Sequence, residues 1–147
     1  MNNAIAGLIF GVMLLVLSLP AWAHTKKDHS DPVAAPHGGQ SLTAGPYHLE
    51  LVAKDGELLL YVTDHADKAI PTNGARAKAT IQHGFEKARI QVELEPSGDN
   101  TLKGTGAFTI NQDTGIMVFL KLPEQEAYAA RFTPLGPNAA QGKKNHK

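Results

Sequence analysis

The chain contains no cysteine, and this absence excludes several classes of protein at once. Without a thiol there is no disulfide, no thiolate zinc site, no iron–sulfur cluster and no cysteine nucleophile. Charge of either sign is not in excess, because 14 Lys and Arg residues face 14 Asp and Glu residues. A balanced charge argues against a nucleic-acid partner, since binding to a phosphate backbone requires a basic surface. The length of 147 residues predicts a single domain.

Sequence signatures of catalysis are also missing. The chain has no nucleophile elbow, P-loop, dinucleotide-binding fingerprint or HExxH motif. Glu93 and Glu95 fall on one face of a predicted strand, but two like charges in that position are typical of exposed surface. We therefore predict that the chain is not an enzyme.

The first 23 residues differ from the rest because they carry no charged side chain. An apolar run over Ala4–Leu19 is followed by Pro20 and by Ala21-Trp22-Ala23, the pattern of a secretory signal peptide with its cleavage site. We predict cleavage after Ala23 and no membrane association afterwards. An uncleaved anchor is the alternative, but a spanning helix needs about 20 apolar residues.

The remaining chain divides into three parts by composition. Residues 24–40 are polar and proline-rich and predict a flexible lead, and residues 136–147 predict a disordered basic tail. Between them, residues 41–135 form the predicted folded domain. A protein without thiols is well suited to an oxidising compartment, which agrees with export.

Hydrophobicity in this domain repeats every two residues, which predicts strands and no helix. The clearest feature is a hairpin, in which alternating runs on either side of Asp55-Gly56 are joined by a two-residue turn. The expected strands cover residues 47–54, 58–63, 75–82, 88–95, 101–110, 115–122 and 127–133. About seven antiparallel strands at this spacing predict an immunoglobulin-like β-sandwich, although the Cys…Trp…Cys markers of true immunoglobulin domains are absent.

The predicted core consists of aliphatic residues together with the phenylalanines that follow the signal peptide. We expect Phe85, Phe108, Phe119 and Phe132 to lie inside. A domain of this length can bury enough apolar surface to fold alone.

All seven histidines lie after Ala23, and three of them have neighbours that suit a metal site. His37 precedes two glycines, His48 shares a predicted strand face with Glu50, and His65 lies in Asp64-His65-Ala66-Asp67. Each position also has an ordinary interpretation, as a turn, an exposed strand residue or a polar loop. The four other histidines, which we expect to be idle, are His24, His29, His83 and His146.

The ligand types restrict the metal. Imidazole and carboxylate without thiolate suit Zn(II), Cu(II), Ni(II) or Co(II) rather than Cu(I). Because a ligating imidazole must be neutral, binding is expected to weaken as the pH falls below about 6.5. The candidate metal ligands are His37, His48, Glu50, Asp64 and His65.

Four short segments together resemble a known family: Pro36-His37-Gly38-Gly39, Ala44–Val52, Lys54–Leu58 and Tyr61–His65. They look like the N-terminal domain of periplasmic adaptor (membrane-fusion) subunits of heavy-metal RND efflux pumps. The resemblance implies a periplasmic location and traffic of divalent cations, with His37, His48, Glu50 and His65 as matching positions. The helical hairpin, lipoyl domain and barrel of a full adaptor are absent, so the chain resembles a stand-alone form of the small domain.

Two functions follow as hypotheses. The first is a periplasmic protein that binds divalent heavy-metal ions as a buffer or carrier, with components of an efflux system as partners. The second is a structural or protein-interaction module with no metal role. Convergence of two or more of His37, His48 and His65 within ligand distance of one ion would favour the first function, and dispersed histidines would favour the second.

Overall fold

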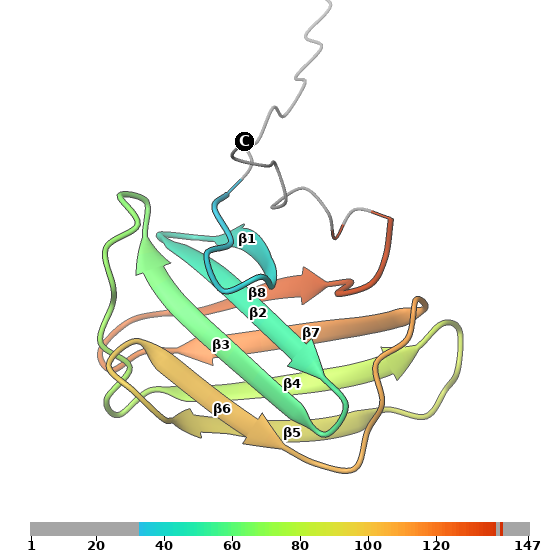
Figure 1. The fold of residues 1–147 in the computed structure, drawn as a ribbon. Helices are drawn as coiled ribbons and strands as arrows, with labels where there is room; N and C mark the ends of the chain where they lie inside the picture. The colour runs from blue at the N-terminus through green and yellow to red at the C-terminus, as the bar shows by residue number, and fades with distance from the viewer. Residues whose placement is uncertain (1–32, 138, 140–147) are drawn as a thin grey trace, which may run out of the picture.

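The computed structural model describes residues 33–137 and 139 (Figure 1), so the predicted signal peptide lies outside the described residues. No helix of the described part is long and apolar enough to cross a membrane. The described residues form eight strands: β1 (Gln40–Ala44), β2 (Tyr47–Lys54), β3 (Glu57–Asp64), β4 (Arg76–His83), β5 (Ile90–Pro96), β6 (Thr101–Thr105), β7 (Thr114–Lys121) and β8 (Ala127–Phe132).

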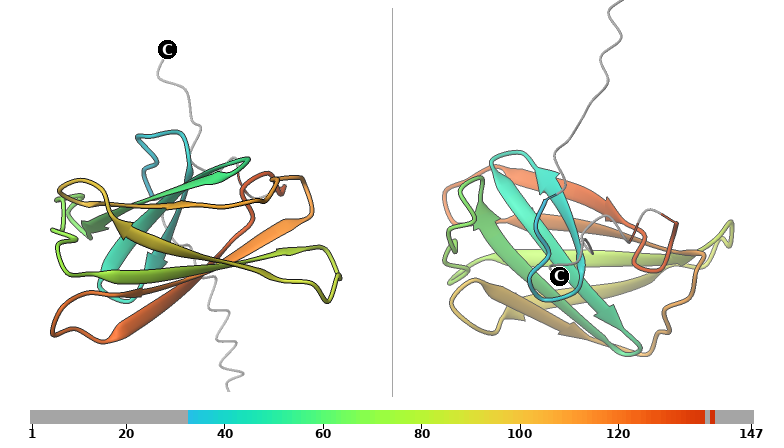
Figure 2. Two further views of the ribbon diagram at one scale, coloured as in Figure 1. Left: turned by 90° about the horizontal axis from the view of Figure 1, so that it is seen from below. Right: turned by 45° about the horizontal axis from the view of Figure 1, so that its top comes forward.

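The strands are all antiparallel and follow one another in the order β1-β2-β3-β6-β5-β4-β7-β8. We call β1-β2-β3-β6 sheet A and β5-β4-β7-β8 sheet B. The two sheets are joined where β5 and β6 pair over only two residue pairs, Glu95 with Lys103 and Pro96 with Leu102. At the other edge β1 approaches β8, and the Thr133 amide donates a hydrogen bond to Gln40 Oε1 at 2.7 Å. The sheet is therefore nearly closed, with its two halves packed face to face (Figures 1 and 2).

The core lies between the two sheets and follows the two-residue period of the sequence. Leu58, Leu60 and Val62 of β3 are fully buried, and the residues between them are only half-buried. In sheet B, Ile116, Val118 and Leu120 of β7 point inward in the same way. Each such side chain stabilises the fold by roughly 1.5–3 kcal/mol relative to an exposed position.

The all-β antiparallel class is confirmed. The described residues form eight strands rather than about seven, because Gln40–Ala44 forms β1. The first three strands form a meander in one sheet, whereas the first sheet of an immunoglobulin domain places its strands in the order A-B-E-D. The immunoglobulin-like expectation therefore holds for the two packed sheets and not for the strand order.

The expected strand over residues 101–110 is too long. β6 ends at Thr105, and residues 106–113 form a connection to β7. The connection is attached to the β2–β3 hairpin, since Gly106 N donates to Gly56 O at 3.1 Å and Ile110 N donates to Asp55 Oδ1 at 2.7 Å. The other expected strands differ from β2, β3, β4, β5, β7 and β8 only by small shifts at their ends.

Two of the four predicted core phenylalanines are outside. Phe132 and Phe108 are buried, but Phe119 is half-exposed and Phe85 is fully exposed. Phe119 faces outward because its neighbours Val118 and Leu120 on β7 take the inward positions. Phe85 follows the end of β4, at a turn beyond the sheet. Residue type alone therefore misplaced these two side chains.

The end of the expected lead belongs to the folded structure. The predicted boundary between residues 40 and 41 falls inside β1, and residues 33–39 fold back over sheet A. Gly38 N donates to Ala35 O at 3.1 Å, and Ser41 Oγ donates to Ala34 O at 2.7 Å. Residues 24–32 lie outside the described part of the chain.

Candidate metal centre

The β2–β3 hairpin brings two of the predicted ligands together. Its register pairs Tyr47 with Asp64, so His48 at the start of β2 and His65 just after β3 lie at one end of sheet A. His48 Nε2 is 3.1 Å from His65 Nδ1. The two rings stand nearly perpendicular, with an interplanar angle of 88° and a centroid distance of 4.8 Å.

The outer nitrogen of each ring faces an oxygen that only accepts hydrogen bonds. His65 Nε2 is 3.2 Å from the Gly45 carbonyl oxygen, and His48 Nδ1 is 3.4 Å from Asp67 Oδ1. These contacts assign the proton of each neutral ring to its outer nitrogen. The inner nitrogens, His48 Nε2 and His65 Nδ1, then both present lone pairs.

Two facing lone pairs require something between them, which is either a proton or a cation. A metal-binding histidine commonly donates its other N–H to a carboxylate or a backbone carbonyl, and His48 and His65 use one of each. The separation of 3.1 Å also fits a single ion. Two metal–nitrogen bonds of about 2.0–2.1 Å spanning this distance meet at roughly 100°, an angle that Zn(II) and Cu(II) both accept.

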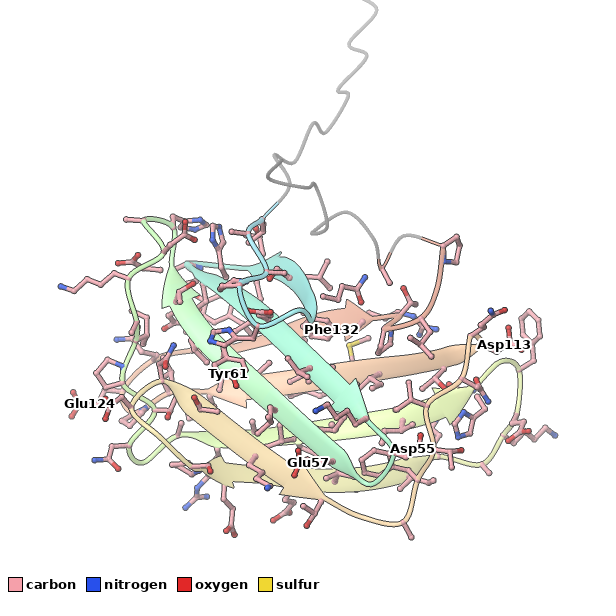
Figure 3. The ribbon with its side chains drawn as sticks, viewed as in Figure 1. Asp55, Glu57, Tyr61, Asp113, Glu124 and Phe132 are labelled. Carbon is pink, nitrogen blue, oxygen red and sulfur yellow. The ribbon has the colours of Figure 1, made fainter. Side chains whose placement is uncertain are left out.

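The other predicted imidazole–carboxylate pair is a clamp that holds the chain before β1. Glu50 is 5% exposed, although its side chain is on the outer face of β2, because residues 33–39 cover it. Its Oε1 accepts hydrogen bonds from His37 N at 2.8 Å and Gly39 N at 3.0 Å, and its Oε2 is 2.7 Å from His37 Nδ1. The His37 ring stacks at a centroid distance of 3.6 Å on Tyr61 of β3. Tyr61 is labelled in Figure 3.

The two glycines after His37 are required by this clamp. Gly38 has a φ of 79°, a left-handed conformation that glycine adopts without strain. A Cβ on Gly39 would lie 2.4 Å from the Leu51 carbonyl oxygen, so only glycine fits there. The His-Gly-Gly sequence thus brings two backbone amides to the Glu50 carboxylate.

Asp64 is used by the turn that carries His65. Its Oδ1 accepts hydrogen bonds from Ala66 N at 2.8 Å and Lys68 N at 3.0 Å. These two backbone hydrogen bonds, the one from Lys68 first, hold the pKa of Asp64 below its usual value. The carboxylate therefore orders the loop, and within the described residues it does not form a three-ligand group with the two histidines.

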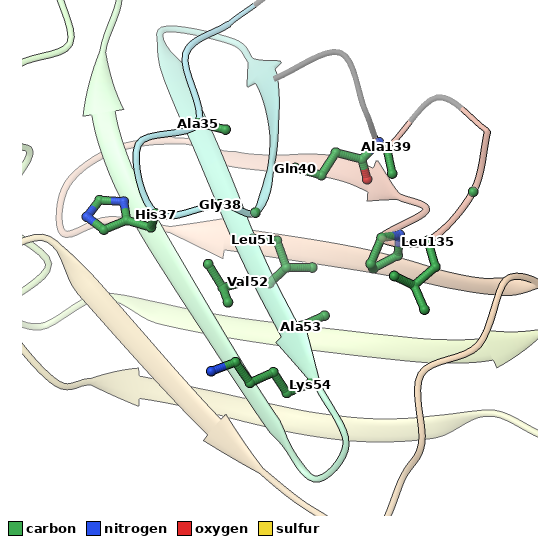
Figure 4. A pocket seen from close by; sticks show the side chains of 13 residues that line it. Ala35, His37, Gly38, Gln40, Leu51, Val52, Ala53, Lys54, Leu135 and Ala139 are labelled. Atoms are coloured by element: carbon green, nitrogen blue, oxygen red, sulfur yellow. The ribbon is translucent and has the colours of Figure 1, made fainter. Parts of the chain in front are cut away.

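A pocket of about 280 Å³ lies between the folded-back chain and sheet A. Its lining includes His37, His48, Glu50, Tyr61 and Asp67. A second pocket, of about 550 Å³, lies between Gly38–Gln40, β2 and the segment after β8 (Figure 4). The described residues that line the second pocket include no carboxylate, so it offers no mixed metal site.

The structure thus divides the five predicted ligands into three groups: His48 with His65, His37 with Glu50, and Asp64 alone. Among residues 33–137 and 139, no three His, Cys, Asp or Glu side chains are grouped to hold one ion. His83 is at the end of β4, on the opposite side of the molecule, where its Nδ1 contacts Thr114 Oγ1 at 3.0 Å. His24, His29 and His146 lie outside the described residues.

From the sequence, Asp67 was identified only as a neighbour of His65, and neither its contact with His48 nor the pairing of the two histidines was predicted. The signal for the pairing was present, since a two-residue turn at Asp55-Gly56 fixes the hairpin register and places His65 beside Pro46. Asp67 has a φ of 58°, a conformation that gave no signal in the sequence.

No protein-family model, no curated protein and no solved structure matches this chain.

Proposed function

We propose that this chain binds a divalent transition-metal ion through His48 Nε2 and His65 Nδ1. The observation that carries the proposal is the 3.1 Å separation of these nitrogens, each in a ring whose other nitrogen faces an acceptor. Zn(II), Cu(II), Ni(II) and Co(II) are the ions that imidazole ligands suit. With two ligands from one chain, the affinity should be lower than that of a structural site with four protein ligands.

The biological role that fits such a site is a buffer or carrier of heavy-metal ions in the periplasm, working with an efflux system. The signal-peptide pattern of residues 1–23 supports export. The resemblance of Pro36–His65 to metal-efflux adaptor domains supports the link to efflux. A weak site suits a protein that must release its ion as well as bind it.

Isothermal titration of the chain from His24 onward with each of the four ions tests the proposal. His48→Ala and His65→Ala should each lower the affinity by at least about tenfold, since even outer-shell partners of a metal are worth 10–100-fold. Binding should weaken below about pH 6.5, where an imidazole ordinarily gains a proton.

His83→Ala is the matched control, because it removes an imidazole from the opposite side of the molecule. It also leaves His24, His29 and His146 unchanged, as the two test variants do. No binding of any of the four ions would contradict the proposal, and so would equal affinities for all three variants. Either result would favour an interaction module without a metal role.

A further inference from the structure

An ion held only by His48 and His65 has coordination positions left to fill. Structural zinc sites are almost always four-coordinate, with four ligands from protein. Within the described part of the chain, no third His, Cys, Asp or Glu side chain joins the pair. Asp67 contacts the outer nitrogen of His48, and both oxygens of Glu50 are occupied by the clamp.

The position of the pair leaves it open to another molecule. His65 is exposed in the loop after β3, and the adjoining turn residues Gly45 and Pro46 are exposed as well. The His48 side chain is 17% exposed and lies beside them. His48 at the start of β2 and His65 in the loop after β3 therefore lie at one end of sheet A, beside exposed turns that a second protein surface can approach. Figure 1 shows this end of β2 and β3.

On the basis of the proposed metal site, we propose that two copies of this chain share one ion. A two-fold axis through the ion places His48 and His65 of each copy around it and supplies four imidazoles. A two-fold contact needs no second kind of surface, because each copy contributes the same residues. The bite of roughly 100° within each pair is compatible with four-coordination around a single centre.

The charges around the pair favour this assembly only when the ion is present. The loop Asp64–Lys68 carries two carboxylates and one ammonium group, so it has a net charge of −1. Two such loops brought together repel each other, whereas a divalent cation between them neutralises their combined charge. The dimer should therefore depend on the metal rather than form by itself.

Sedimentation velocity with a Zn(II) titration, paired with calorimetry, tests the inference on the chain from His24 onward. The mass should double as Zn(II) approaches about 0.5 ion per chain, and EDTA should reverse the change. Excess Zn(II) should restore the monomer, because each copy then binds its own ion. His65→Ala should remain monomeric throughout, whereas His83→Ala should dimerise like the unchanged chain.

The possible outcomes distinguish a failure of the shared-ion dimer from a failure of the proposed metal site on which it rests. One ion per chain with no change in mass would overturn the shared ion and leave the site of His48 and His65 intact. No binding at all would overturn both. A combined replacement of His24, His29 and His146 by Ala should leave dimerisation unchanged. Loss of the dimer in that variant, or a dimer that forms without metal, would also overturn the inference.

Discussion

His37 and His48 each meet a carboxylate through Nδ1, but the two pairs do different work. Glu50, the partner of His37, is 5% exposed and also accepts two backbone hydrogen bonds, from His37 and Gly39. Asp67, the partner of His48, has a side chain that is 67% exposed and contacts His48 at 3.4 Å. The same two residue types therefore form a closed structural clamp in one place and, in the other, an exposed contact to a histidine that we propose as a metal ligand.

The difference lies in what surrounds each carboxylate. Two amides of the chain before β1 donate to Glu50 Oε1, and the His37 ring contacts Oε2, so both oxygens of this buried carboxylate have partners. Asp67 makes its contact to His48 in water, where such a bond contributes little to stability. The comparison teaches that burial and backbone donors, rather than the imidazole–carboxylate pair itself, decide between a structural and a binding role.

Removing the buried carboxylate should have the largest effect on stability. Glu50→Ala leaves the His37 and Gly39 amides without their acceptor, and we expect it to lower the free energy of unfolding by about 2–3 kcal/mol. Urea unfolding followed by circular dichroism measures this loss.

Asp67→Asn is the matched control for the exposed pair. Asn is chosen because the φ of 58° at this position is tolerated by Asn and would strain Ala. The control should change the free energy of unfolding by less than about 0.5 kcal/mol. Equal losses in Glu50→Ala and Asp67→Asn would remove the distinction between the clamp and the exposed contact.

For metal affinity the ranking of the two carboxylates should be the opposite, with Asp67 more important than Glu50. The reason is that Asp67 contacts His48 and Glu50 does not. Asp67→Asn replaces a charged acceptor by a neutral one, and we expect the Kd for Zn(II) to rise by roughly tenfold, the low end for an outer-shell partner. Titration calorimetry measures the change. Asp64→Asn, in the same loop, should keep the Kd within about twofold, and an equal loss there would show that only the charge of the loop matters.

The sequence predicted this fold where period and turn chemistry agreed, as in the hairpin around Asp55-Gly56. It did not predict β1, because Leu42 is the only large apolar residue among Gln40–Ala44. It also overextended the strand that ends at Thr105, since the residues beyond are held by a distant hydrogen bond from Ile110 to Asp55. Long-range contacts leave no local pattern.

The candidate site was also predictable only in part. The shared outer face of His48 and Glu50 follows from the two-residue period of a strand. The covering of Glu50 by residues 33–39 does not, because it depends on how a chain without periodicity folds back over sheet A. That one tertiary contact separates Glu50 from the two histidines of the proposed metal site.

The smallest expected change in stability concerns the carboxylates of Asp64 and Glu57. The two should differ in how salt affects their contribution to stability. Hydrogen bonds from the Lys68 and Ala66 amides lower the pKa of Asp64, whereas a hydrogen bond and charge attraction from Lys103 lower the pKa of Glu57. A lowered pKa stabilises the fold above the value of the unfolded chain, about 4 for both groups. This stabilisation is lost as the pH falls through the lower, folded-state pKa.

Asp64→Asn and Glu57→Gln should therefore each be less stable than the unchanged chain at pH 5, and the difference should shrink toward pH 2. Adding 0.5 M NaCl at pH 5 should diminish the Glu57→Gln difference, because salt screens the exposed ion pair with Lys103. The same salt should leave most of the stability difference between Asp64→Asn and the unchanged chain, because that difference arises from backbone hydrogen bonds within a turn. Urea midpoints at both salt concentrations measure these differences, and equal salt sensitivity would mean that charge attraction, not the turn, lowers the pKa of Asp64.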